Sequence, residues 1–89
     1  MSDTEEVAVI PAVYERIRDY LNLGLIVDTE VWPAVMSGGW YLVFKTKNVA
    51  GHFILASRTT KQPREFRTLD ALARVLRDLG YKVNGFRVL

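Results

Sequence analysis

The sequence predicts an α+β domain: an N-terminal helix, a three-stranded antiparallel sheet and a second helix packed on that sheet, in the order α-β-β-β-α, with a short strand closing the chain. Two features predict this class. Residues 40–45 and 52–58 are rich in aromatic and β-branched side chains and lie close enough to form a hairpin. Residues 69–79 place leucines at helical spacing between two capping residues.

The first helix is predicted near the start of the chain. The polar residues before it predict a flexible N-terminus over residues 1–8, so that a single domain covers residues 9–89. Pro11 suits the first turn of a helix, and Ile17 and Leu21 continue an apolar spacing that ends at Gly24. We therefore expect a helix over residues 11–23.

The segment that follows is less regular. Residues 25–27 are apolar and fit either a short strand or an extended segment. Residues 31–36 are ambiguous, because Pro33 argues against a central strand. Residues 37–39, a serine and two glycines, predict a turn into the hairpin.

The hairpin is expected to have one face in the core. With Thr46 opposite Phe53, side-chain alternation divides the two strands into two faces. The drier face, which we assign to the core, carries Trp40, Leu42, Phe44, Phe53 and Leu55. The other carries Tyr41, Val43, Lys45, Ile54, Ala56 and Arg58. Because contiguous apolar residues rarely stay exposed in a monomer, we expect the N-terminal helix to cover Tyr41, Val43 and Ile54; the alternative is an exposed patch.

The third strand and second helix follow directly. Residues 64–67 are expected to form an edge strand with Phe66 pointing inward, after a turn at Pro63. Thr68 is a candidate N-cap and Gly80 a candidate C-cap. Between them an apolar stripe comprises Leu69, Leu72, Ala73, Leu76 and Leu79. Residues 81–89 alternate well enough to predict a final strand.

Composition excludes several classes of protein. Eighty-nine residues allow one domain, and the absence of cysteine excludes disulfides and thiolate chemistry. The acidic N-terminus is unlike a signal peptide and there is no long apolar run, so we expect a soluble, cytoplasmic protein without a membrane partner.

No residue pattern points to catalysis. The single histidine, His52, has no sequence-near partner for a triad or metal site, and we expect a surface imidazole. None of the serines lies in a nucleophile-elbow pattern, and the turn at residues 37–39 lacks the lysine of a phosphate-binding loop. We therefore expect no enzyme activity, no cofactor, no metal and no small-molecule substrate.

Charge is divided unequally along the chain. Residues 1–44 hold two bases and seven acids, a net charge of −5, whereas residues 45–89 hold ten bases and three acids, a net charge of +7. A basic half attracts phosphates, although the two halves can also neutralise one another. The candidate nucleic-acid-binding residues are Lys45, Lys47, Arg58, Lys61, Arg64, Arg67, Arg74 and Arg77.

One motif spans the junction between the third strand and the second helix. It consists of Gly38-Gly39-Trp40, Ser57-Arg58, Arg64-Glu65-Phe66-Arg67-Thr68-Leu69-Asp70-Ala71-Leu72-Ala73, Leu76, Gly80 and Phe86-Arg87-Val88. This pattern resembles the small plasmid partition-associated proteins of the ParC type, with Arg67 where that family has Lys and Leu72 where it has its second Ala. More loosely, it is similar to the arm-type DNA-binding domains of tyrosine integrases, which are three strands plus a helix.

The resemblance covers residues 38–88 and implies a plasmid or mobile-element context without any catalytic residue. It leads us to expect a non-enzymatic accessory protein that binds DNA through a basic face. The alternative is a protein-interaction module, either a homodimer or a regulator that docks on a partner by an apolar patch or an exposed edge strand.

Overall fold

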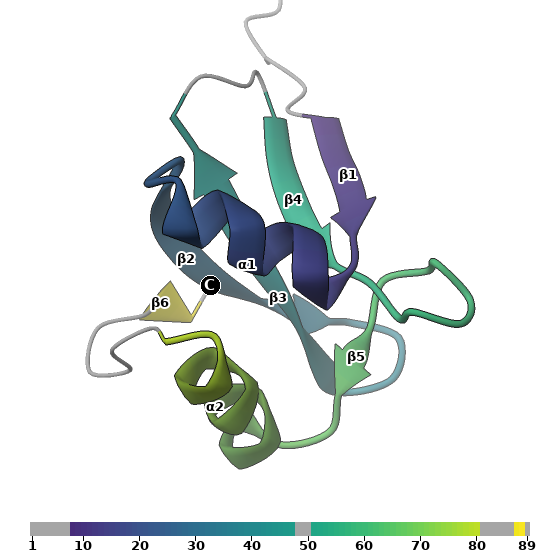
Figure 1. Cartoon of the computed structure of the whole chain (residues 1–89). Coiled ribbons are helices and arrows are strands. Elements are labelled where there is room, and N and C mark those ends of the chain that lie inside the picture. The colour runs from purple at the N-terminus through teal and green to yellow at the C-terminus, as the bar shows by residue number, and fades with distance from the viewer. Residues whose placement is uncertain (1–7, 48–50, 81–86, 89) are drawn as a thin grey trace, which may run out of the picture.

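The computed structural model describes residues 8–47, 51–80 and 87–88 (Figure 1). Its elements are β1 (Ala8–Ala12), α1 (Tyr14–Asn22), β2 (Ile26–Ala34), β3 (Gly39–Thr46), β4 (Gly51–Leu55), β5 (Glu65–Phe66), α2 (Leu69–Asp78) and β6 (Arg87–Val88). The α+β class is confirmed. Of the helices in the described part of the chain, neither has the length and apolar character needed to cross a membrane.

The sheet is larger and more varied than the sequence predicts. Its described strands run in the order β1-β4-β3-β2-β6, and β5 pairs with β3 beside β4. The neighbours of β3 are antiparallel to it, but β1 is parallel to β4 and β6 is parallel to β2. The prediction of a purely antiparallel, three-stranded sheet is therefore wrong. The predicted closing strand is present at Arg87–Val88, while residues 81–86 and 89 lie outside the described residues.

The segment around Pro11 is a strand and not the first turn of a helix. Pro11 lies in β1, and α1 begins three residues later at Tyr14. The carbonyl of Ala12 accepts from the Ala56 N–H on the β4 side (2.9 Å), so the backbone nitrogen of the preceding Pro11 lies on the outer side of β1. A proline is tolerated there because no ladder bond is lost. Residues 1–7 lie outside the described residues, but Ala8, predicted to be flexible, is in β1.

Pro33 is likewise compatible with a strand. β2 (Ile26–Ala34) includes most of the apolar segment at residues 25–27 and the first four residues of the ambiguous one at residues 31–36. Pro33 lies opposite Trp40 of β3. The other side of β2 pairs with β6 only at Glu30 and Val31. Beyond those two residues β2 is an edge strand, and an edge strand accepts a proline.

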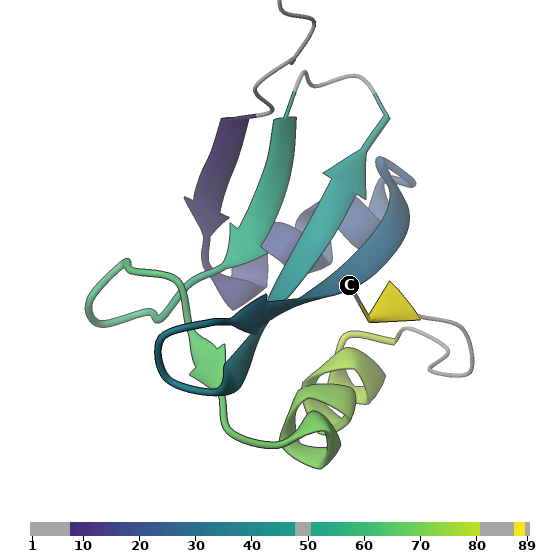
Figure 2. The same ribbon diagram turned by 180° about the vertical axis from the view of Figure 1, so that it is seen from behind.

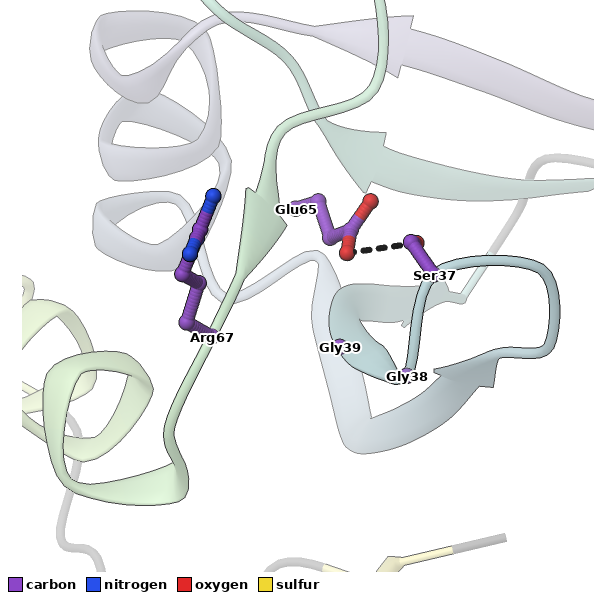
Figure 3. Close-up of a pocket in the computed structure, with 5 residues that line it drawn as sticks. All are labelled: Ser37, Gly38, Gly39, Glu65 and Arg67. Carbon is purple, nitrogen blue, oxygen red and sulfur yellow. Dashed lines mark hydrogen bonds between the residues drawn. The ribbon is translucent and has the colours of Figure 1, made fainter.

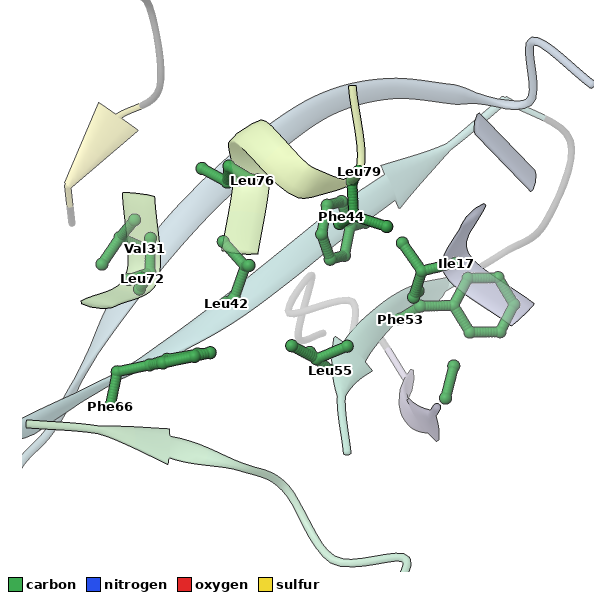
Figure 4. Packing of buried hydrophobic residues seen from close by; sticks show 11 residues of the cluster. Ile17, Val31, Leu42, Phe44, Phe53, Leu55, Phe66, Leu72, Leu76 and Leu79 are labelled. Atoms are coloured by element: carbon green, nitrogen blue, oxygen red, sulfur yellow. The ribbon is translucent and has the colours of Figure 1, made fainter. Parts of the chain in front are cut away.

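Both helices pack on one face of the sheet. Ile17 of α1 and Leu72 and Leu76 of α2 are buried against Leu42 and Phe44 of β3 (Figure 4). The predicted core face of the hairpin is confirmed, although its register differs: Phe44 lies opposite Phe53, where the sequence analysis placed Thr46. The shift is two residues, and an even shift leaves every side chain on its predicted face.

The opposite face of the sheet is not covered by either described helix. Figure 2, the view from behind, has α1 on the far side of the sheet, so the expectation that the N-terminal helix covers Tyr41, Val43 and Ile54 is wrong. Val43 is nevertheless buried, because Glu30 and Ile54 flank it directly on neighbouring strands. We call this side of the sheet, which carries Tyr41, Val43, Lys45 and Ile54, the helix-free face.

The predicted second helix and both of its caps are present as α2. The Thr68 side chain accepts from the Ala71 N–H at 3.1 Å, as an N-cap does. Gly80 has a φ of +91° and donates its N–H to the Arg77 carbonyl at 2.9 Å. The predicted third strand is also present as β5, in which Phe66 is 3% exposed.

The buried hydroxyl of Thr29 lowers the stability of the fold, so its removal should stabilise the protein. Thr29 is 1% exposed beside Phe44 on the core face, and its Oγ1 has no hydrogen-bond partner among the described residues. We expect Thr29→Val to raise the free energy of unfolding, measured by urea denaturation, by about 1 kcal/mol, because it removes an unsatisfied polar group at nearly constant shape. Thr29→Ser, the control, keeps the hydroxyl, loses the methyl group and should lower stability. A loss of stability in Thr29→Val would contradict this account.

Candidate nucleic-acid interface

The loop that connects β4 with β5 is rich in basic residues. We call residues 56–64 the basic loop; it contains Arg58, Lys61 and Arg64 and no acid. In Figure 1 it projects to the side of the sheet. The Ser57 N–H donates to the Gln62 carbonyl at 2.9 Å, and the Lys61 N–H donates to the Ser57 carbonyl at 2.9 Å. These bonds give an exposed loop a defined conformation.

The basic loop is closed at its root. Ala56 forms an isolated bridge with Pro63, and the Arg64 N–H donates to the Leu55 carbonyl at 2.8 Å. Lys61 has a φ of +62°, a left-handed conformation that turns the chain at the tip, and its Nζ donates to the Arg58 carbonyl at 3.0 Å. The loop therefore presents its cations on a folded scaffold.

Two of its arginines are held by neighbouring elements. The Arg58 guanidinium pairs with the Glu15 carboxylate of α1, and both side chains are exposed, at 72% and 53%. A pair so exposed to water contributes less than about 1 kcal/mol. The Arg64 guanidinium lies over the Phe66 ring, 4.6 Å from its centroid. Since Phe66 is buried, this cation–π contact holds the Arg64 side chain against a fixed ring.

A hollow of about 500 Å³ opens at the root of the basic loop. Its lining residues are Tyr14, Leu55, Ala56, Ser57, Arg58 and Arg64. The apolar part of the lining comes from Leu55 and Ala56, both of which are buried. The other lining residues are two arginines, a serine and a tyrosine, whose guanidinium and hydroxyl groups are donors suited to a phosphate.

A smaller hollow of about 290 Å³ lies between the β2–β3 turn and β5 (Figure 3). It is lined by Ser37, Gly38, Gly39, Glu65 and Arg67, and the Ser37 hydroxyl donates to Glu65 Oε2 at 2.6 Å. Gly39 is required there, since an added Cβ would lie 2.7 Å from the Phe66 carbonyl oxygen. The predicted turn is confirmed, and Arg67 is exposed beside an acid.

Lys45 lies away from the basic loop and is engaged on the helix-free face. Its Nζ is 2.8 Å from Glu30 Oε2, and the Trp32 indole N–H donates to Glu30 Oε1 at 3.0 Å. The Glu30 side chain is only 6% exposed, so Lys45 compensates a nearly buried charge. Lys47 is exposed at the end of β3, and its N–H donates to the Leu25 carbonyl at 2.8 Å.

Arg74 and Arg77 lie on the exposed side of α2. Asp70 is four residues before Arg74 and Asp78 four residues after it, so both acids share that side of the helix. The exposed surface of α2 thus carries two bases and two acids, and it adds no net positive charge to an interface.

The structure therefore brings together only part of the predicted set. Arg58, Lys61 and Arg64 share the basic loop, with Arg67 just beyond β5, while the other four lie elsewhere. The expected grouping of Arg58 with Lys45 on one sheet face is wrong, because β4 ends at Leu55. Sequence reasoning missed Tyr14 and Ser57. No local signal marks Tyr14, because only the packing of α1 beside β4 brings it to the hollow.

His52, predicted to be a surface imidazole, is only partly exposed. Its ring lies edge-on to Trp32, with centroids 6.2 Å apart, and its Nδ1 is buried without a hydrogen-bond partner among the described residues. Within the described ranges, no three His, Asp or Glu residues are grouped as a metal site would need.

Comparison with known proteins finds no family model, no curated protein and no solved structure that matches this chain. The resemblance to ParC-type proteins and to integrase arm-type domains therefore stays a prediction.

The two ion pairs should differ sharply in their contribution to stability. We expect Lys45→Met to lower the free energy of unfolding by about 3 kcal/mol, because it removes the ammonium group that pairs with the nearly buried Glu30 carboxylate. Arg58→Met, which removes an exposed pair, should lower it by less than about 1 kcal/mol. Thermal or urea unfolding of both variants measures the difference. Equal losses would contradict the contrast in burial.

Proposed function

We propose that the protein is a non-enzymatic, DNA-binding accessory protein whose basic loop contacts the phosphate backbone. The observation that carries this proposal is the composition and shape of residues 56–64: three bases, no acid, and an internally hydrogen-bonded conformation that projects from the sheet. Arginine and lysine on such a loop neutralise phosphates and release counterions. Arg67 extends the charge toward α2. The plasmid or mobile-element context rests on the sequence resemblance alone.

The helix-free face is a poorer surface for DNA. On β2, β3 and β5 it carries three acids, Asp28, Glu30 and Glu65, and one base, Lys45. Lys45 is engaged by Glu30, and acids outnumber bases among these residues, so this face suits a phosphate backbone less well than the basic loop does. We therefore do not expect the sheet to enter a major groove and contact base edges as a β-ribbon does.

Salt-dependent binding to a duplex tests the loop. Fluorescence anisotropy of a labelled duplex should give a Kd that weakens about 40-fold between about 50 mM and about 200 mM salt if three phosphates are contacted. Lys61→Gln should weaken binding and reduce the salt slope by about 0.9. Arg74→Gln, a control on the charge-balanced helix, should have a smaller effect. A chain that does not bind at the lower salt concentration would contradict the proposal.

A second candidate function, a protein-interaction module, is favoured by the helix-free face. Trp32 and Tyr41 are cross-strand neighbours there and both are partly exposed. Tryptophan and tyrosine dominate protein interfaces, especially when they are held rigidly, as the Glu30 carboxylate holds Trp32. The β1 edge is less suitable for strand pairing, because Pro11 lacks a donor on its outer side.

Self-association tests this second candidate in its homodimer form. The sedimentation coefficient of the full chain should rise with concentration, and Tyr41→Ser should abolish the rise. Met36→Ser is the matched control, since Met36 is 98% exposed on the β2–β3 turn and not on the helix-free face. A chain that stays monomeric at every concentration would exclude the homodimer.

A further inference from the structure

We infer that the hollow at the root of the basic loop binds an unpaired nucleotide, with its phosphate at Arg58 and its base stacked on Arg64. The inference rests on the proposed function and specifies its ligand. The protein should bind single-stranded nucleic acid more tightly than duplex.

The hollow has the size and lining that a nucleotide needs. At about 500 Å³ it lies within the range of small-ligand sites, which combine apolar walls with a few polar groups. Leu55 and Ala56 supply apolar lining, and Ser57 and Tyr14 line the hollow together with the two arginines. The smaller hollow beside Glu65 is unsuitable, because a carboxylate lines it.

Arg64 provides the stacking surface. The Arg64 Cζ lies over the Phe66 ring, 4.6 Å from its centroid, and Phe66 is buried in the core. Because Arg64 also lines the hollow and is exposed, a base in the hollow can lie against its guanidinium. Arginine planes and aromatic rings are the platforms on which proteins stack unpaired bases, and a guanidinium already held by a ring loses little freedom on binding.

Arg58 provides the charge for the phosphate. Its present partner is the exposed Glu15 carboxylate, and an exposed ion pair is exchanged at small cost. A phosphate in the hollow can take the place of that carboxylate, with the Ser57 hydroxyl as a second donor. Phosphate and base are thus received by two separate arginines on opposite ends of one loop.

This geometry should make the protein bind single-stranded DNA more tightly than duplex DNA. A base inside a duplex is stacked between its neighbours and cannot reach Arg64, whereas a base in a single strand can. Duplex DNA is then bound by phosphate contacts alone, and single-stranded DNA by the same contacts plus one stacked base.

The experiment compares anisotropy titrations of a labelled oligothymidine and a duplex of equal length at one salt concentration, using the full chain. We expect the single strand to bind about fivefold or more tightly, the effect of one stacked base. Arg64→Lys keeps the charge and loses the plane, so it should remove the preference while duplex binding persists. Arg74→Lys is the control and should leave the preference unchanged, and unfolding curves confirm that both variants are folded.

Each outcome separates the inference from the proposed function. Equal or tighter binding of the duplex overturns the inference and leaves phosphate binding by the basic loop intact. A preference that persists in Arg64→Lys also overturns it, because the base is then held elsewhere. Failure to bind either nucleic acid overturns both.

Discussion

The alternation of side chains along β3 is the constraint on which the rest of the structure depends. Leu42 and Phe44 are completely buried on one face of this strand, and both helices pack against that face. β3 pairs with β2 along one side and with β4 and β5 along the other. Each neighbour must therefore present its own apolar side chains to the same face, which Val31, Phe53 and Phe66 do. A single strand thus determines where the core lies and which face stays without a helix.

The basic loop is a consequence of how β4 and β5 share one side of β3. Ile54 of β4 lies opposite Val43, and Glu65 of β5 lies opposite Tyr41, so β5 continues the line of β4 after residues 56–64 have left the sheet. The loop is held at both ends by the pairing of β4 and β5 with β3 and by the hydrogen bond from the Arg64 N–H to the Leu55 carbonyl. This explains how a segment of polar residues can project into solvent and still keep a defined shape.

The opposite charges of the two halves of the chain meet in the folded protein. Glu15 from the acidic half pairs with Arg58, and Glu30 pairs with Lys45. The two pairs differ in burial, so the two cations differ in their availability to a ligand. Lys45 pairs with a nearly buried carboxylate, whereas a phosphate can replace the exposed carboxylate that pairs with Arg58. The candidate site is therefore narrower than the positive charge of the sequence suggests, and it is concentrated on the loop.

The sequence by itself determined the elements whose signals are local. Thr68, the leucine stripe and Gly80 specify α2 within a dozen residues, and the period of two specifies which side of the hairpin enters the core even though its register was two residues off. Only the tertiary structure decided that β1 and β6 pair in parallel, that α1 packs on the same face as α2, and that Tyr14 meets Arg58 and Arg64. The physical reason is separation along the chain: a parallel pairing or a contact between α1 and the basic loop depends on how distant segments bury apolar surface together, and no local pattern records that choice.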